Sequence, residues 1–235
     1  MAGTGRRLWP FTLAAAFLAM AIEPAPAQLF SPPGLIPNRP VPPRSVPKKP
    51  PPPGDVGELI TRGDELIEKN KLDDAIANFS QAIKLDPKSA DAWFRRAYAY
   101  SRKGERRRAI ADYNEVIKLA PEEASAWNGR CWERAVLNEL KQALTDCNEA
   151  IKLKPDDAEA FDSRGFTYLK LGQVESAIDD FDHALKLDDK LAGSLYGRGM
   201  AKLKKGDKDA GKADIDAAKA IKPDITKDYA SYGVK

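Results

Sequence analysis

Residues 90–123 read ADAWFRRAYAYSRKGERRRAIADYNEVIKLAPEE, and the same arrangement of residues returns through most of the 235-residue chain. Its period shows in the prolines, because Pro87, Pro121 and Pro155 lie at steps of 34 residues and Pro223 lies two steps further on. A fixed period of this length indicates a protein built from stacked structural repeats. With the proline at position 32 of each repeat, the chain holds five repeats, at 56–89, 90–123, 124–157, 158–191 and 192–225.

Each repeat predicts two α-helices with apolar stripes. Positions 4, 8 and 11 form one set and positions 20, 24 and 27 a second, which in the second repeat are Trp93, Ala97, Tyr100, Ala109, Tyr113 and Val116. Residues at i, i+4 and i+7 share one face of a helix. Between the two sets, position 15 holds residue types that tolerate the left-handed backbone conformation in which helices end. They are Asn70, Gly104, Asn138, Gly172 and Gly206.

This pattern resembles the signature of the tetratricopeptide repeat (TPR) family: a large residue, a small one and an aromatic one, then alanine, an aromatic residue, alanine and proline. The resemblance spans five repeats of 34 residues, or 170 of the 235 residues. It implies an all-α fold, a right-handed α-solenoid of five TPR helix-turn-helix repeats. In this family the concave groove, lined by the first helix of each repeat, binds peptides or proteins.

The fifth repeat has the features of the end of such an array. Lys212 and Lys219 occupy positions where the other repeats have isoleucine or leucine. A terminal helix that faces water is expected to lose apolar residues at such positions. Residues 226–235 resemble the start of a sixth repeat and then stop, so we expect a truncated capping helix there.

Residues 1–27 have the three-part pattern of a secretory signal peptide. Arg6 and Arg7 precede an apolar run over residues 8–22, and Ala25-Pro26-Ala27 places small residues before a cleavage site. We expect cleavage after Ala27 and a periplasmic or secreted mature chain, with a Gram-negative bacterium as the source. The alternative is an uncleaved membrane anchor, although the run is shorter than the roughly 20 residues that span a bilayer.

Residues 28–55 contain 11 of the 18 prolines. Proline fixes φ and removes a backbone donor, so this segment is expected to be a disordered linker outside any packed core. It acts either as a tether for the repeats or as a ligand for a domain with an aromatic groove.

The composition excludes several classes of function. The chain has 38 Lys+Arg and 35 Asp+Glu, a net charge of +3, which argues against a nucleic-acid partner. His183, Cys131 and Cys147 are its only histidine and cysteines, too few for a zinc site or a Ser-His-Asp triad. We also find no phosphate-binding loop or nucleophile elbow. We therefore expect no enzymatic activity, no metal and no cofactor, and a monomer that binds a protein or peptide.

The concave groove is the expected binding surface, because positions 5 and 9 lie roughly opposite the core stripe of the first helix. The residues expected there are Phe94, Tyr98, Asn128, Trp132, Asp162, Phe166, Tyr196 and Met200. A contiguous row of large apolar side chains marks a binding site. In the alternative interpretation, position 9 packs against the first helix of the next repeat. Of the polar residues, only Asn128 and Arg95 resemble the set with which some TPR domains clamp a C-terminal carboxylate.

Two residues of this region carry further expectations. Trp132 is expected to lie off the core, so that its loss weakens binding more than folding. Lys170, at position 13, is expected to be exposed near the rim of the groove.

Arginines and a lysine form a second candidate site. The turn of the second repeat carries a basic patch of Arg102, Lys103, Arg106, Arg107 and Arg108. It is either a docking site for an acidic protein or anionic headgroups, which would give peripheral envelope association, or a solvated turn. Position 7 is arginine in every repeat: Arg62, Arg96, Arg130, Arg164 and Arg198. These side chains either contact anions or lay their stems over the seam between helices.

Cys131 and Cys147 are a candidate disulfide, because an exported chain enters an oxidising compartment. They occupy positions 8 and 24 of the third repeat. Position 8 is expected to face position 20 most directly, which leaves free buried thiols as the alternative. Taken together, the sequence predicts an exported adaptor. The alternative is a scaffold of an envelope complex that assembles through its outer faces or the basic patch.

Overall fold

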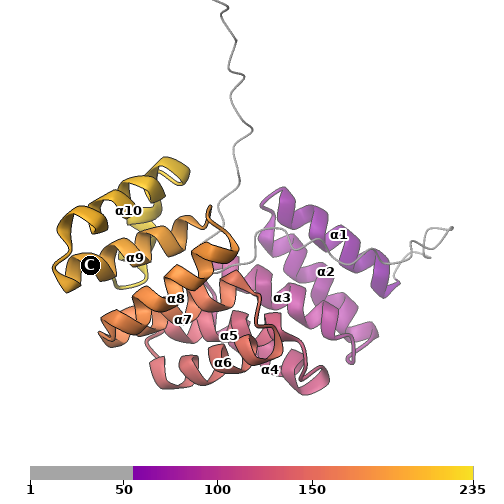
Figure 1. Ribbon diagram of the computed structural model, residues 1–235. Helices are drawn as coiled ribbons and strands as arrows, with labels where there is room; N and C mark the ends of the chain where they lie inside the picture. The colour runs from indigo at the N-terminus through magenta and orange to yellow at the C-terminus, as the bar shows by residue number, and fades with distance from the viewer. Residues whose placement is uncertain (1–54, 235) are drawn as a thin grey trace, which may run out of the picture. The chain divides into compact units, whose positions relative to one another are not determined.

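The structure is a computed structural model that describes residues 55–234. The signal peptide expected at 1–27 and residues 28–54 of the expected linker lie outside the described residues. Within the described range every regular element is a helix (Figure 1). The helices are α1 (Val56–Glu68), α2 (Leu72–Leu85), α3 (Ala90–Lys103), α4 (Arg106–Leu119), α5 (Ala124–Val136), α6 (Leu140–Leu153), α7 (Ala158–Leu171), α8 (Val174–Leu187), α9 (Ala192–Lys205), α10 (Lys208–Ile221) and α11 (Ile225–Ser231).

The helices pair in chain order, α1 with α2 through α9 with α10, and each pair packs on the next. This arrangement confirms the all-α solenoid of five helix-turn-helix repeats. Lys212 and Lys219 are exposed on α10, as expected for a terminal helix. Among the described residues, no helix has both the length and the apolar character that crossing a membrane requires.

The turns inside the repeats use the left-handed backbone that position 15 predicts. Asn70 and Asn138 have φ of 54° and 66°, and the glycines at this position in the other three repeats also have positive φ. The N–H of the following residue then donates to a carbonyl in the last turn of the first helix, as Lys71 does to Leu66 at 2.8 Å. These hydrogen bonds end the first helix and turn the chain into the second.

The aromatic residue at position 24 fills the space between successive first helices. Phe79 and Phe181 are fully buried. A Cβ atom on Gly63 would lie closer than 3.0 Å to the Phe79 ring, and one on Gly197 would meet the Phe181 ring as closely. Position 24 therefore faces small residues in its own repeat and in the next. Burial of such a ring stabilises the fold by roughly 1.5–3 kcal/mol.

A ladder of arginine–aspartate pairs joins the two helices of repeats 2 to 5. The position 7 arginine donates through Nε and Nη2 to both oxygens of the aspartate at position 23, over 2.6–2.9 Å. Its Nη1 also reaches position 25 of the preceding repeat, as Arg130 does to Asn114 at 2.8 Å. The pairs are Arg96–Asp112, Arg130–Asp146, Arg164–Asp180 and Arg198–Asp214.

The ladder decides between the two interpretations of the position 7 arginines in these repeats. Their stems cover the seam, since Arg130 lies over the Trp127 ring with 4.8 Å from Cζ to the ring centroid. Their charged ends bind aspartates of the same chain. In the first repeat position 23 is Asn78, and Arg62 instead pairs with Glu58 at 2.9 Å on the surface.

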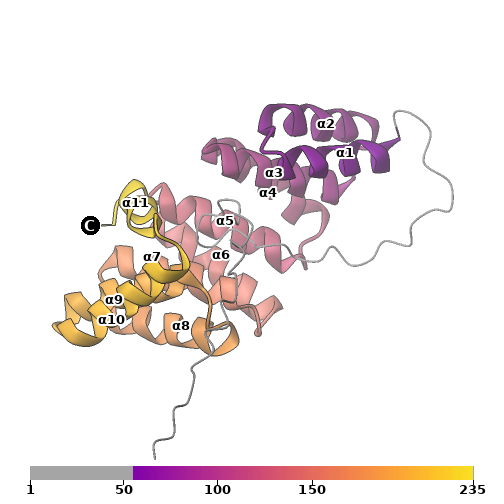
Figure 2. The same cartoon turned by 90° about the horizontal axis from the view of Figure 1, so that it is seen from above.

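The C-terminal residues reach back over the first helices of the later repeats. Helix α11 begins at Ile225, one residue before the expected capping helix, and Tyr232–Val234 follow it. Figure 2 shows α11 next to α5 and α7. Tyr229 is fully buried, and its hydroxyl donates to the carbonyl of Gly193 at 2.8 Å.

Candidate functional site

The first helices of the repeats, α1, α3, α5, α7 and α9, contact one another in order. We call the surface formed by positions 5 and 9 of these helices the inner face. Position 9 holds Asp64, Tyr98, Trp132, Phe166 and Met200. The ring centroids of Trp132 and Phe166 are 4.8 Å apart. The interpretation in which position 9 packs on the next repeat therefore holds between repeats 3 and 4.

The centre of the inner face is covered by the chain itself. Trp132 and Phe166 are both fully buried. The Tyr232 ring meets Trp132 edge-on with 5.3 Å between centroids, and the Tyr229 ring meets Phe166 at 5.6 Å. The expectation that Trp132 lies off the core is therefore wrong. The repeat pattern describes contacts inside one repeat and gives no sign that a later segment packs on position 9.

Three more of the residues expected in the groove are buried: Asn128, Asp162 and Tyr196. Asp162 accepts a hydrogen bond from Ser194 Oγ at 2.6 Å, and burial raises the pKa of its carboxyl to about 6. The Tyr196 ring lies 4.6 Å from the Tyr229 ring. Asn128 is 2% exposed, and its Oδ1 makes no hydrogen bond within the described part of the chain. These residues support the packing between repeats and do not line an open surface.

The accessible aromatic part of the inner face lies on α3. Phe94 and Tyr98 keep partial exposure, as Met200 does on α9. Phe94 packs edge-on against Tyr113, with 5.7 Å between centroids. Burial raises the pKa of the Tyr98 hydroxyl, and the nearby Arg102 opposes this shift. Of the eight residues expected in the groove, these three remain available for contact with a partner.

The two residues that resemble a carboxylate clamp do not form one. Arg95 donates to Asp64 at 2.6 Å and to Asp91 at 2.9 Å. A guanidinium held by two carboxylates has its positive charge more than neutralised. Asn128 is buried, so neither side chain is placed to hold a carboxylate of a partner.

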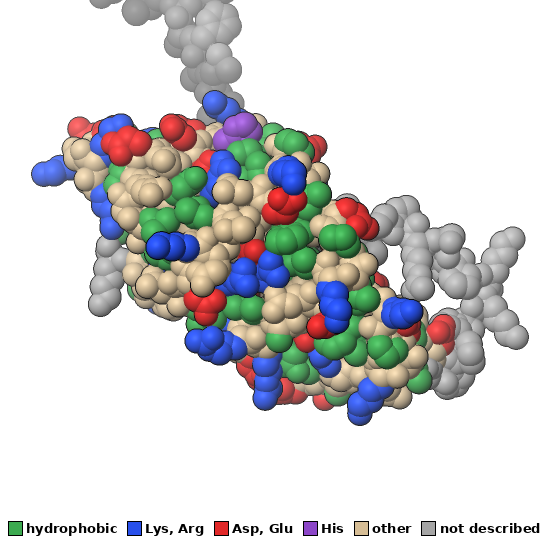
Figure 3. All heavy atoms as spheres, turned by 90° about the horizontal axis from the view of Figure 1, so that it is seen from below, with side chains coloured by type: hydrophobic (Ala, Val, Ile, Leu, Met, Phe, Trp, Pro, Cys, Tyr) green, Lys and Arg blue, Asp and Glu red, His purple; other side chains and the backbone are tan. Residues whose placement is uncertain are grey.

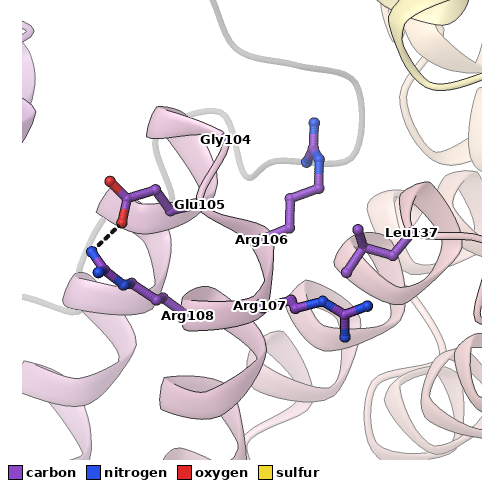
Figure 4. Close-up of a pocket in the computed structure, with 6 residues that line it drawn as sticks. All are labelled: Gly104, Glu105, Arg106, Arg107, Arg108 and Leu137. Atoms are coloured by element: carbon purple, nitrogen blue, oxygen red, sulfur yellow. Dashed lines mark hydrogen bonds and ion pairs between the residues drawn. The ribbon is translucent and has the colours of Figure 1, made fainter.

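The basic patch is largely neutralised by its neighbours. Figure 4 shows Arg108 bonded to Glu105, with Arg106 and Arg107 directed away from that pair. The partners are Ile67 O and Asn70 for Arg102, Asp73 and Glu105 for Lys103, Glu133 for Arg106, Glu139 for Arg107 and Glu105 for Arg108. On the face in Figure 3, Lys and Arg are interspersed with Asp and Glu. The patch therefore fastens repeats 1 to 3 together. Arg107 and Arg108, at 80% and 69% exposed, extend furthest into solvent.

Sequence reasoning missed a buried carboxylate beneath this patch. Glu133 is 0% exposed and accepts hydrogen bonds from Ser101 Oγ and from Arg106 Nη1, the latter at 2.9 Å. Burial raises the pKa of the Glu133 carboxyl, and Arg106 opposes the shift. Position 10 is alanine or threonine in repeats 2, 4 and 5. Repeat 1 also has glutamate at this position, the exposed Glu65, so the residue type alone did not distinguish Glu133 as buried.

The single histidine has a structural contact. His183 is exposed on α8 and stacks on Phe161, with 4.0 Å between ring centroids. In the range 55–234 no group of three or more His, Cys, Asp or Glu side chains is arranged to hold a metal ion.

Cys131 and Cys147 form a disulfide that joins α5 to α6, with 5.3 Å between their Cα atoms. Position 8 meets position 20 in repeat 5, where Gly199 lies against Gly211, but it also lies close enough to position 24 for the bridge in repeat 3, so the expectation that position 24 is too far away is wrong. The bridge occupies the place that a glycine and a phenylalanine share in repeat 1, where the ring of Phe79 lies against Gly63. A bridge that closes a loop of about 15 residues stabilises a fold by roughly 3 kcal/mol in the chain-entropy account.

Sequence profiles of known families match most of the repeat region. A profile described as TPR repeat matches residues 63–104 and 136–172. Profiles described as tetratricopeptide repeat match 90–123, 158–191 and 192–225, which are the bounds expected from the proline period. A search of curated protein sequences gave no match.

Several solved structures share the fold. A thermophilic TPR protein of Thermus thermophilus, TTC0263, is 20% identical with a TM-score of 0.62, over 76% of this chain and 97% of that one. MamA 41-end from Desulfovibrio magneticus RS-1 is 17% identical with a TM-score of 0.61, over 72% and 95%. YrrB, described as a TPR protein with an unusual peptide-binding site, is 22% identical with a TM-score of 0.56, over 77% and 93%. At these identities the likeness concerns the fold.

Proposed function

Because the chain belongs to the tetratricopeptide repeat family, we propose that it is a non-enzymatic adaptor that binds a peptide or protein partner on its inner face. The observation that carries the proposal is the partly exposed pair Phe94 and Tyr98 on α3. Aromatic side chains are enriched at the centre of binding surfaces, and charged residues such as Arg95 and Asp64 are typical of the polar rim around it. The peptide-binding site in the description of YrrB supports the same class of ligand.

Replacing Tyr98 by alanine tests this proposal. We expect Tyr98→Ala to weaken partner binding by about 2 kcal/mol, or about thirty-fold, because aromatic residues dominate binding energy at such surfaces. The partner is captured from the native envelope with the wild-type chain, and its affinity for each variant is then measured.

Tyr100→Ala is the matched control. Tyr100 lies on the same helix and is also partly exposed, but two residues along a helix it points to a different side, where Arg96 and Arg108 cover its ring. Equal losses in the two variants would contradict a site on the inner face. If Arg107→Glu with Arg108→Glu abolishes binding while Tyr98→Ala binds normally, the chain is a scaffold that assembles through the basic patch.

We also propose that the chain is exported with residues 1–27 removed and residues 28–55 acting as a tether. The signal-peptide pattern supports this proposal, and so does the disulfide, which is typical of oxidising compartments. Intact mass of the exported protein, alkylated without reductant, is expected to correspond to a chain that starts at Gln28 with no labelled thiol. A mass that retains residues 1–27 argues against export by cleavage, and two labelled thiols argue against the bridge.

A further inference from the structure

Residues 225–234 lie on the part of the inner face that the rest of the repeats would leave uncovered. Tyr229, in the last turn of α11, and Tyr232, the residue that caps this helix, stand three residues apart, which places both on one side of the segment. Tyr229 packs on Phe166 and Tyr196, and Tyr232 packs on Trp132. The opposite side of the segment is exposed at residues 226, 227, 230, 231 and 233. The segment is thus a short amphipathic helix seated on aromatic side chains of α5, α7 and α9.

Two cations hold the end of the segment. The expectation that Lys170 is exposed near the rim of the groove is wrong. Its Nζ donates to the carbonyl of Tyr232 at 2.9 Å and to that of Ala135 at 2.8 Å. The Arg106 guanidinium lies 5.5 Å from the centroid of the Tyr232 ring while it donates to Glu133. Carbonyl capture by a lysine at a helix C-terminus and a cation over an aromatic face are both ways to recognise a peptide.

The apolar side chains of the segment belong to the core cluster of repeats 3 to 5, but the polar and covalent ties between the helices of the repeats lie elsewhere. The arginine–aspartate ladder, the position 24 aromatics and the disulfide lie between α1 and α10 and include no residue of 225–234. Only Tyr232 and Val234 of the terminal residues 230–234 are buried. Release of the C-terminal segment would uncover Trp132 of repeat 3 and Phe166 of repeat 4, which pack on each other. The arginine–aspartate ladder would stay in place.

We propose that residues 225–234 are an intramolecular ligand of the inner face, and that a partner enters repeats 3 to 5 by displacing them. The partner segment has the same chemistry: two aromatic residues three apart on a helical turn, followed by a small and an aliphatic residue, as in Tyr229, Tyr232, Gly233 and Val234. The statement that a partner displaces the segment rests on the proposed function. The competition with the C-terminal segment is tested without one.

The test uses the full mature chain and a synthetic peptide of residues 224–235 that carries a fluorophore. Binding is followed by fluorescence anisotropy to the wild type, to Tyr232→Ala and to Tyr100→Ala as the matched tyrosine control. A tethered ligand acts at an effective concentration of about millimolar. We therefore expect the peptide to bind Tyr232→Ala at least ten-fold more tightly than it binds the wild type. Tyr100→Ala should behave as the wild type, and a peptide with both tyrosines replaced by alanine should not bind.

Amide hydrogen exchange in the same chains separates release of the segment from general unfolding. We expect the amides of 230–234 to exchange faster in Tyr232→Ala while those of α1–α10 keep their protection. Equal peptide affinity for Tyr232→Ala and the wild type would overturn the proposal. So would amides that stay protected in Tyr232→Ala, or a freed segment with no peptide binding, because the segment would then be a fixed part of the fold. If the peptide binds Tyr232→Ala more tightly than the wild type but Tyr98→Ala binds the partner normally, the proposed site on α3 is wrong and the intramolecular ligand is still supported.

Discussion

Replacement of Trp132 by alanine is expected to lower the free energy of unfolding by about 3–5 kcal/mol. Trp132 is the largest fully buried side chain of the described residues, and it contacts the rings of Phe166 and Tyr232 at once. Its loss leaves a cavity between repeats 3 and 4 and removes the support of the C-terminal segment. Chemical denaturation followed by far-ultraviolet circular dichroism measures the loss.

Trp132→Phe is the matched variant, because the indole Nε1 of Trp132 is buried and makes no hydrogen bond with any described residue. A phenyl ring keeps much of the contact area and leaves no unpaired donor, so Trp132→Phe should lose far less stability than Trp132→Ala. Unchanged unfolding of Trp132→Ala would mean that the inner face is open at this position and that the C-terminal segment does not cover it.

Asp180→Ala is expected to cost about 3–5 kcal/mol, since removal of one partner from a buried ion pair leaves the other charge uncompensated. Asp180 is 6% exposed and accepts two hydrogen bonds from Arg164, at 2.7 and 2.8 Å. Arg164 also donates to Asn148 of the preceding repeat at 2.9 Å. The substitution therefore weakens both the helix pair of repeat 4 and its contact with repeat 3.

The neighbouring residue supplies the control. Asp179 is the same residue type on the same helix and is exposed, so Asp179→Ala should change the unfolding midpoint little. Both variants are compared in the same denaturant titration. If Asp179→Ala and Asp180→Ala lower the free energy of unfolding equally, the arginine–aspartate ladder does not hold the two helices together as its geometry indicates.

The fold was predictable because its determinants recur at fixed positions. The proline period sets the repeats, Asn or Gly at position 15 sets the turns, and Lys212 and Lys219 mark the last helix, and each of these features has the expected structure. The ladder was also readable, since arginine at position 7 and aspartate at position 23 recur together in four repeats. A spacing of 16 residues does not stand out as helical, and only the pairing of two helices brings these positions together.

The inner face was harder to predict because its burial depends on a segment outside the repeat pattern. Position 9 lies off the stripe that faces the second helix, so Trp132 and Phe166 read as exposed when one repeat is considered alone. Contacts between neighbouring first helices and the packing of Tyr229 and Tyr232 bury them. The disulfide was also not predictable, because it requires positions 8 and 24 to lie close together and the sequence does not show whether they do.

The central claim is that this protein binds a partner through its inner face, and site-specific photo-crosslinking in cells that produce the protein tests it most directly. The photoreactive residue p-benzoyl-phenylalanine is introduced in place of Tyr98 on α3 or in place of Asp179 on the exposed side of α8. Our account predicts a discrete crosslinked product from position 98 and none from position 179. A product from position 179 alone would contradict it and would place the partner on the outer surface.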